Sequence, residues 1–257
     1  MLSNNDIKLI RSLEHKKHRH QHKLFVAEGE KILKDVINNG CNIKRIFLTK
    51  EGYSRLENDI LSYNINAEII TEKELNKISF LTTANTGLAL LNIFDFEHKE
   101  PIDFDIVLML DAIRDPGNLG TIIRIADWFG IKNIICSKDT VDFTSPKVIQ
   151  ATMGSFLKVS INYCNLEDYL KSINKTTTIY ASSLNGSPLN EIEPKKPAII
   201  IIGNESKGIS ENLMKLVDEK IKIPCGVNSG AESLNAAVAT AIIAYHTNVR
   251  SKRRSRI

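Results

Sequence analysis

The sequence is poor in cysteine, and its four cysteines form neither a metal-binding motif nor a disulfide framework. They stand singly at Cys41, Cys136, Cys164 and Cys225, with no Cys-x-x-Cys pair. Isolated cysteines of this kind are typical of reduced residues in or near the core of a cytoplasmic protein. The histidines near the N-terminus are interleaved with lysine and arginine, which would repel a metal cation. We therefore expect no metal site.

Long apolar runs are also absent. The run at 197–203 (PAIIIIG) is far too short to cross a bilayer, which takes roughly 20 apolar residues. The first 18 residues lack the apolar core of a signal peptide. Two nucleotide-binding fingerprints, Gly-x-Gly-x-x-Gly and Gly-x-x-x-x-Gly-Lys-Ser/Thr, do not occur either. These absences argue against a membrane role, a dinucleotide-binding fold and a phosphate-loop nucleotidase, and we expect a cytoplasmic protein.

What the sequence does contain is local concentrations of positive charge. The net charge of the 257 residues is only +4, but basic residues gather at 15–23 (HKKHRHQHK) and at 250–257 (RSKRRSRI). Such clusters suit contacts with phosphate. Each could equally be a solvated helix face or a frayed tail. From the first cluster we select four candidate RNA contacts: Lys16, Lys17, Arg19 and Lys23.

The length allows one large domain or two modest ones, and the pattern indicates two. The first hundred residues alternate short helices and strands, with strands expected at 24–29, 43–49, 67–71 and 87–94 and helices around Ile7 to Leu13, at 30–40 and at 72–79. Charge, Pro101 and the loss of periodicity at 95–105 predict a linker. We therefore expect domains at 1–98 and 104–257.

The second domain alternates more regularly, which predicts a mostly parallel sheet covered by helices on both faces. Strands are expected at 104–110, 131–136, 157–164, 176–182, 197–203 and 219–225. Ser145 and Pro146 are suited to be the N-cap and first residue of a helix in this domain. Ligands of open parallel sheets bind beyond the carboxyl ends of the strands. The loops after 104–110, 197–203 and 219–225 should therefore converge if their strands are neighbours.

These three loops are the chemically rich ones. The first joins a strand to an amphipathic helix and places Arg124 about one turn from the loop. The second, 203–208 (GNESKG), lets backbone approach a ligand at two glycines and supplies a carboxylate. The third contains Ser233 and Asn235, either of which could be a plain N-cap. Alternatively, the glycines of the first loop only form a turn and Arg124 is a solvated helix residue.

The three segments together resemble a known family. The stretches 115–130 (DPGNLGTIIRIADWFG), 201–210 (IIGNESKGIS) and 223–242 (IPCGVNSGAESLNAAVATAI) are similar to the three ordered motifs of the SpoU (TrmH) family of RNA ribose 2′-O-methyltransferases, within the knotted SPOUT class. The stretch 25–40 (FVAEGEKILKDVINNG) resembles the small α/β, L30e-like substrate-binding domain that often precedes them.

The resemblance implies a trefoil knot near the C-terminus, a homodimer and S-adenosylmethionine as cofactor. Carried over by motif, the cofactor-binding residues are Gly203, Asn204, Glu205, Gly208, Ile223, Pro224, Ser233 and Leu234. The residues implied in catalysis and RNA placement are Asn118, Arg124, Glu205, Ser233 and Asn235. A guanidinium normally stays protonated, so we expect Arg124 to anchor phosphate and orient the hydroxyl rather than accept its proton.

Two other functions are compatible with parts of the sequence. A non-enzymatic RNA-binding protein could retain the fold, but the intact polar residues of the motifs argue against it. A nucleotide-dependent oxidoreductase could have a similar sheet, but it would carry a glycine fingerprint after the first strand. We therefore expect methyl transfer from S-adenosylmethionine to a ribose 2′-hydroxyl of structured RNA, with ribosomal RNA favoured over transfer RNA.

Overall fold

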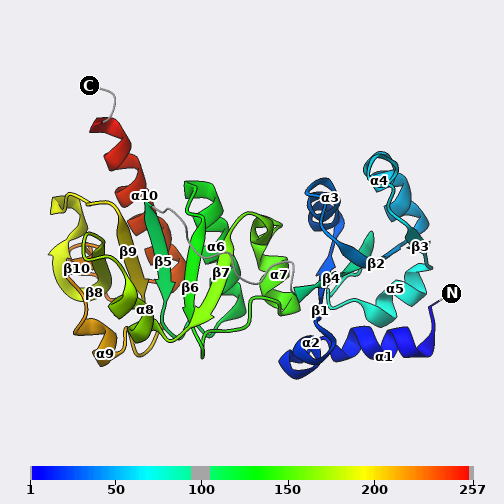
Figure 1. Ribbon diagram of the computed structural model, residues 1–257, viewed down its shortest axis with the longest axis horizontal. Helices are drawn as coiled ribbons and strands as arrows, with labels where there is room; N and C mark the ends of the chain where they lie inside the picture. Colours follow the sequence, from blue (N-terminus) through cyan, green and yellow to red (C-terminus); the bar gives the residue numbers. More distant parts are fainter. Residues whose placement is uncertain (1, 94–104, 255–257) are drawn as a thin grey trace. The chain divides into compact units, whose positions relative to one another are not determined.

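The computed structural model describes residues 2–93 and 105–254, with side chains up to 248, and divides them into two compact units (Figure 1). The first unit contains 2–93 and 142–157, and the second contains 105–141 and 158–254. The predicted linker at 95–105 lies, apart from Asp105, outside the described residues. Among the described residues, no helix is both long and apolar enough to span a membrane.

The first unit is built on a four-stranded sheet with the order β1-β4-β2-β3. Strand β4 is antiparallel to β1 and β2, whereas β2 and β3 are parallel. The elements in chain order are α1 (Asn4–Ser12), α2 (Lys16–His22), β1 (Leu24–Glu28), α3 (Glu30–Asn38), β2 (Ile43–Leu48), α4 (Lys50–Ser62), β3 (Ala67–Ile69), α5 (Glu72–Ile78) and β4 (Gly87–Asn92). Helix α4 was not predicted. Its buried residues, Gly52, Leu56 and Ile60, recur at helical spacing, but they are few, include a glycine and stand among many polar residues.

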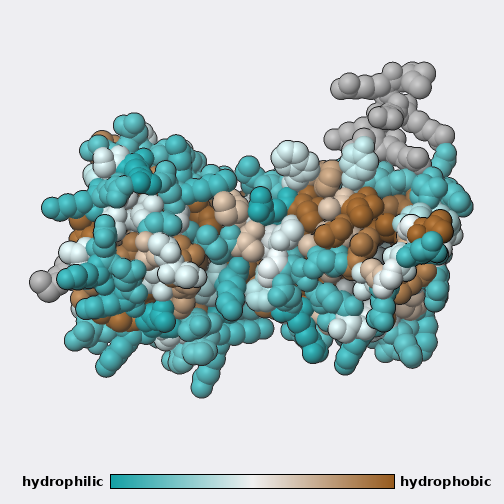
Figure 2. Space-filling view, turned by 180° about the vertical axis from the view of Figure 1, so that it is seen from behind, coloured by the Kyte–Doolittle hydropathy of each residue, from teal (hydrophilic) through white to brown (hydrophobic). Residues whose placement is uncertain are grey.

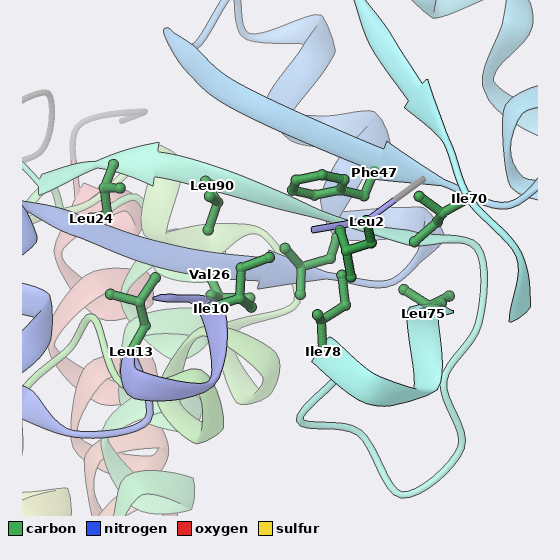
Figure 3. Packing of buried hydrophobic residues seen from close by; sticks show 11 residues of the cluster. Leu2, Ile10, Leu13, Leu24, Val26, Phe47, Ile70, Leu75, Ile78 and Leu90 are labelled. Atoms are coloured by element: carbon green, nitrogen blue, oxygen red, sulfur yellow. The ribbon is translucent and has the colours of Figure 1, made fainter. Parts of the chain in front are cut away.

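One apolar cluster holds the first unit together. Ile10 and Leu13 from α1 and its C-terminus, Val26 from β1 and Phe47 from β2 are buried side by side (Figure 3). Leu75 and Ile78 from α5 close the same cluster. Burying such side chains removes apolar surface from water at roughly 25 cal/mol per Å², so this cluster fixes α1 and α5 on one face of the sheet.

The segment 142–157 belongs to the first unit by its contacts, although the sequence analysis placed it in the second domain. It contains α7 (Pro146–Thr152) and a short 3-10 turn, η2 (Ser155–Leu157), and Ser145 caps α7 as predicted. The ring of Phe25 in β1 packs edge-on against Phe143 and Phe156, with centroid separations of 6.4 and 6.0 Å. Chain continuity alone could not reveal this, because the contacts join residues more than a hundred positions apart.

The second unit contains a six-stranded sheet with the order β10-β8-β9-β5-β6-β7, and every pair in it is parallel. The elements are β5 (Ile106–Leu110), α6 (Pro116–Phe129), β6 (Asn133–Ser137), β7 (Ser160–Cys164), α8 (Leu166–Ser172), β8 (Thr178–Pro188), η3 (Leu189–Glu191), β9 (Ala198–Ile202), α9 (Glu211–Met214), β10 (Glu219–Lys222) and α10 (Ala236–Arg254). The expected α/β fold with a mostly parallel sheet and flanking helices is confirmed.

Helices cover this sheet because its central strands are apolar on both faces. Val107, Met109, Ile199 and Ile201 pack with residues of α8 and α9. Their alternate neighbours in β5 and β9 point to the opposite face and are also buried. Helix α10 runs beside α6 behind the sheet in Figure 1.

The path of the chain places a site at the centre of the sheet. From β5 the chain moves outward through β6 and β7, and it then returns to build β8 and β9 on the other side of β5. The order thus reverses between β5 and β9, which is where ligands bind in open parallel sheets. From the edge strand β10 the chain comes back to begin α10 beside α6, and the implied knot requires a return of this kind.

Candidate active site

Three side chains from distant parts of the sequence meet at this reversal. The amide nitrogen of Asn118, in the first turn of α6, donates to Glu205 Oε1 at 2.5 Å. The amide nitrogen of Asn235 donates to Asn118 Oδ1 at 2.8 Å. Asn118 therefore joins the loop after β9 to the start of α10. The prediction that the three loops converge is confirmed, although β8 separates β10 from β9.

The other partners of Asn235, and the chemistry of the Glu205 carboxylate, determine which group donates in these two hydrogen bonds. Asn235 Oδ1 accepts from the backbone N–H groups of Ala237 and Val238, so Asn235 is the N-cap of α10 and its NH2 group must face Asn118. The Glu205 carboxylate can only accept when ionised, so the NH2 group of Asn118 must face it. Asn235 thus combines the capping role and the site role that the sequence left as alternatives.

Asn204 fixes the loop that carries Glu205. Its Oδ1 accepts from the backbone N–H groups of Ser206 and Lys207, both at 3.0 Å, and its NH2 group donates to the Ala112 carbonyl at 2.9 Å. Ala112 has a left-handed backbone with φ of 57°, which is uncommon for a residue with a Cβ. Asn204 therefore ties a strained residue of the β5 loop to the β9 loop.

Gly203 allows the β9 loop to close on itself. A Cβ added at Gly203 would lie 2.3 Å from the Gly208 carbonyl carbon and 2.4 Å from the Ile209 nitrogen. The backbones of Asn204 and Gly208 exchange hydrogen bonds of 3.0 and 2.9 Å across this turn. Only glycine fits at position 203, which gives a physical reason for its place in the motif.

Arg124 lies on a different side of helix α6 from Asn118 and its hydrogen bonds. Asp115 caps the helix by accepting from Asn118 N at 2.7 Å, and Pro116 follows as its first residue. Arg124 lies six residues after Asn118, which is a rise of about 9 Å and a rotation of roughly 120° around the helix. It is exposed, and within the described residues no hydrogen bond or ion pair holds its guanidinium. The structure therefore does not pair Arg124 with Glu205.

The segment after β10 is open to solvent. Ile223 is half-buried, and Pro224, Ser233 and Leu234 are exposed. Among the described residues, the backbone of 224–234 makes one internal hydrogen bond, from Ser229 N to Gly226 O at 3.2 Å. Many of its N–H and C=O groups are therefore available to a ligand, and groups of this kind normally find a partner when they are covered.

A fourth loop, not predicted from the sequence, lies at the same edge of the sheet. Ala181 pairs with Lys220, but the next β10 residue pairs with Ser187, so 182–186 leaves the ladder beyond the end of β9. Gly186 permits this excursion, because a Cβ there would lie 2.5 Å from the Lys220 carbonyl oxygen. Leu184 in the excursion is 65% exposed. The glycine and the polar run SSLNG are the only sequence signals of this feature.

The basic cluster at 15–23 divides into two kinds of residue. Lys16, Lys17 and Lys23 are exposed. Arg19 is only 2% exposed and forms an ion pair of 2.7 Å with Asp142, so its selection as an RNA contact is corrected. A guanidinium buried against a carboxylate cannot also reach a phosphate. The side chains of the C-terminal cluster lie outside the described residues.

The four cysteines, all within the described residues, form no disulfide, in agreement with the sequence analysis, but they differ in burial more than expected. Cys136 is buried, and its burial raises the pKa of the thiol well above its ordinary value. Cys225 lies in the exposed segment after β10 and is not a core residue.

Comparison with known proteins gives two matching family models. Residues 105–245 match the SpoU rRNA Methylase family, and residues 4–89 match the MRM3-like substrate binding domain. The chain is 29% identical to the 23S rRNA (guanosine(2553)-2′-O)-methyltransferase RlmP of Bacillus subtilis, over 95% of this chain and 96% of that protein.

Solved structures agree with these matches over the whole chain. One, an RNA methyltransferase assigned to the TrmH family from Porphyromonas gingivalis, has a TM-score of 0.84 and 32% identity and covers 97% of this chain and 99% of that chain. Another, the AdoMet-bound rRNA methyltransferase of Sinorhizobium meliloti, has a TM-score of 0.83 and 29% identity and covers 100% of this chain and 97% of that chain.

Proposed function

The chain belongs to the SpoU rRNA methylase family, and from this membership we propose that it transfers a methyl group from S-adenosylmethionine to a ribose 2′-hydroxyl of structured RNA. The observation that carries the proposal is the contact of Asn118 with both Glu205 and Asn235, which assembles the polar residues of all three motifs. Ribosomal RNA is favoured over transfer RNA, because the Bacillus subtilis relative acts on 23S rRNA.

The residues present suit the cofactor. We assign its binding to Gly203, Asn204, Glu205, Gly208, Ile223, Pro224, Ser233 and Leu234, and we add the excursion at 182–186. The unpaired backbone groups of 224–234 can bond its polar atoms, and Ile223, Leu234 and Leu184 offer apolar surface to its adenine ring. When bound, S-adenosylmethionine supplies a methyl group already activated by the positive charge on its sulfur.

The residues of the chain then have separate tasks. Asn118 and Asn235, whose amides are fixed by the contacts described above, orient the polar groups around the hydroxyl. Glu205 holds Asn118 in place from the β9 loop. Arg124, with no partner of its own among the described residues, is available to bind an RNA phosphate and to direct a second N–H toward the hydroxyl. Lys16, Lys17 and Lys23 would contact phosphates from the first unit.

The direct test combines cofactor binding with methyl transfer. We expect the full chain to bind S-adenosylmethionine in calorimetry and to transfer labelled methyl groups to an unmodified transcript of 23S rRNA at ribose 2′-oxygens. Gly203→Ala should lower the affinity for the cofactor by at least about tenfold, because its methyl group would displace the Gly208 backbone. A folded variant that binds as tightly as the parent chain would contradict the pocket assignment.

We also propose a homodimer formed through α10 and α6. Val238, Ile242 and Tyr245 recur at helical spacing on α10 and are 48, 37 and 58% exposed. Trp128, at the end of α6, is 85% exposed, and its neighbour Phe129 packs edge-on against Tyr245. Figure 2 shows a brown, hydrophobic area on one face of this unit. A contiguous apolar area of this kind on a globular chain marks an interface.

Arg124 lies one turn before Trp128 on the exposed side of α6, next to the proposed interface. A dimer could therefore present this guanidinium to the site of the partner subunit. In light scattering, the full chain should have twice the mass of a single chain. Ile242→Glu should reduce the measured mass to that of a single chain. The matched control is Leu61→Glu, which places the same charge at a 65% exposed leucine of the first unit. A monomeric parent chain with full activity would refute the dimer.

A further inference from the structure

The first unit contains a polar pocket that the active site does not use. It has a volume of about 200 Å³ and lies where α4 and α5 begin and the loop before β4 ends. Thr49, Leu75, Asn76, Ala84 and Asn85 are among its lining residues. Pockets that enclose a drug-sized ligand measure roughly 300–1,000 Å³, so this one has room for a single planar ring and not for a whole nucleotide.

The loop beside the pocket is held in a strained shape. Gly87 N donates to the Asn85 carbonyl at 2.6 Å, which closes a three-residue γ-turn around Thr86. Thr86 is buried and has φ of 58°, a conformation that is strained in a residue with a Cβ. Such strain persists only where the surroundings enforce it, and it is concentrated at functional sites.

Two further contacts enforce this turn. Thr49 N donates to the Thr86 carbonyl at 2.9 Å, while the Thr49 hydroxyl caps α4 by accepting from Gly52 N at 2.9 Å. Gly52 makes room for the turn, since a Cβ there would lie 2.1 Å from the Thr86 carbonyl oxygen. The turn around Thr86 is thus held by Thr49 and accommodated by Gly52, and Asn85, which begins it, lines the pocket.

The charges around the pocket exclude a phosphate ligand. Glu51 and Glu72 line it, and Arg55, the one cation among its described lining residues, is paired with both Glu51 and Glu30. A phosphate would meet these carboxylates without a free cation to offset them. A ligand that donates hydrogen bonds is favoured, because carboxylates only accept.

The amides and the apolar residues complete the ligand chemistry. Asn76 and Asn85 are exposed, and their side-chain amides make no hydrogen bond among the described residues. An asparagine amide offers one donor edge and one acceptor edge, the pattern that matches the edge of a nucleobase. Ala84 is half-buried and lines the pocket, so its methyl group is the apolar surface that a ring can contact, while Leu75 beneath it belongs to the core cluster in Figure 3.

We propose that this pocket binds one unstacked nucleobase of the RNA, and that it selects bases with an exocyclic amino group over uracil. The proposal rests on the proposed function in that the ligand is RNA. It adds a point of base recognition in the first unit, separate from the phosphate contacts of the basic cluster. Sequence-specific recognition of RNA generally uses unstacked bases in this way.

The test uses two fluorescein-labelled 12-nucleotide RNAs, oligo(C) and oligo(U). Cytosine carries a 4-amino donor and an N3 acceptor, whereas uracil carries a 4-carbonyl acceptor and an N3–H donor. In anisotropy titrations the full chain should bind oligo(C) about tenfold more tightly than oligo(U). The double variant Asn76→Ala/Asn85→Ala should bind both alike, and Ala84→Phe, which fills the pocket without removing a polar group, should do the same. Asn38→Ala, an exposed asparagine elsewhere in the unit, is the matched control and should keep the preference.

The salt dependence distinguishes base contacts from phosphate contacts. The slope of log K against log salt should be the same for the parent chain and the double variant, because no phosphate contact is removed. A smaller slope in the variant would show that the pocket contacts phosphate and would overturn the proposal. The proposal would also be overturned if the parent chain bound the two RNAs equally, or bound neither. Cofactor binding and methyl transfer to 23S rRNA are measured in parallel, so failure of the pocket is distinguished from failure of the proposed function.

Discussion

Arg124→Lys is expected to lower methyl transfer by about 100-fold and to leave the affinity for S-adenosylmethionine unchanged. The planar guanidinium can hold a phosphate with one edge and still donate to the ribose hydroxyl, whereas a lysine ammonium is a compact point charge on a flexible stem. The cofactor residues we assign lie in the excursion within β8 and in the loops after β9 and β10, and in the described chain Arg124 makes no hydrogen bond or ion pair with them.

Both quantities should be measured on one preparation of the variant, by calorimetry for the cofactor and by label transfer for the reaction. An RNA with a 2′-deoxy nucleotide at the target is the inactive substrate control. Arg114→Lys is the matched substitution, because Arg114 is an exposed arginine in the loop before α6. Transfer at the parent rate would make Arg124 a solvated helix residue, and loss of cofactor binding would show that the site divides its tasks differently.

The second large effect concerns folding rather than chemistry: Arg19→Met should lower the free energy of unfolding by about 3–5 kcal/mol. The guanidinium of Arg19 donates to Asp142 Oδ2 at 2.7 Å, to Thr144 Oγ1 at 3.0 Å and to the carbonyls of Leu13 and Glu14 at 2.9 and 2.7 Å. Methionine fills much of the same space but leaves the Asp142 carboxylate buried without its main counter-charge. Removing one partner of a buried pair costs far more than the pair itself contributes.

Urea unfolding measures this loss, with Lys16→Met as the matched control. Lys16 lies in the same helix but is exposed, so its replacement should change the stability by no more than about 0.5 kcal/mol. Adding Asp142→Asn to Arg19→Met should recover part of the loss, because the buried charge is then removed. An equal free energy of unfolding for Arg19→Met and the parent chain would show that the Arg19–Asp142 ion pair does not stabilise the fold.

The pH dependence of this pair has a definite sign. Burial alone would raise the pKa of Asp142, but the charge and hydrogen bond of Arg19 and the bonds from Thr144 outweigh it, so the net pKa is lowered. A carboxyl with a lowered pKa contributes stability that is complete above its unfolded value, about 3.9, and is lost as the pH falls through the folded value. In Arg19→Met the charge and hydrogen bond of Arg19 are gone, and burial acts on Asp142 against only the Thr144 hydrogen bonds and His20 at 3.6 Å. The stability difference between the two chains should therefore shrink as the pH falls.

Much of the local structure followed from the sequence. The apolar runs at 106–110 and 198–202 are continuous, so they had to be strands buried on both faces. Ser145 and Pro146 begin α7 because a hydroxyl acceptor and a missing N–H suit the first turn of a helix whatever lies around it. The three motif loops were recognisable for the same reason, because glycines and polar residues directly after an apolar strand indicate a loop whatever the rest of the fold.

The long-range pairings were decided only by the tertiary structure. Arg19 and Lys16 are indistinguishable as letters in a basic cluster, and one is buried because Asp142 reaches it from 123 positions away. Asn235 could have been a plain capping residue until the return of the chain from β10 placed it within one hydrogen bond of Asn118, 117 positions away. Periodicity and capping act over a few residues, so a single sequence displays them. Which charged side chain is buried, and which two amides form a hydrogen bond, depends on residues that the fold brings close from distant parts of the chain. Local sequence patterns do not predict these long-range contacts.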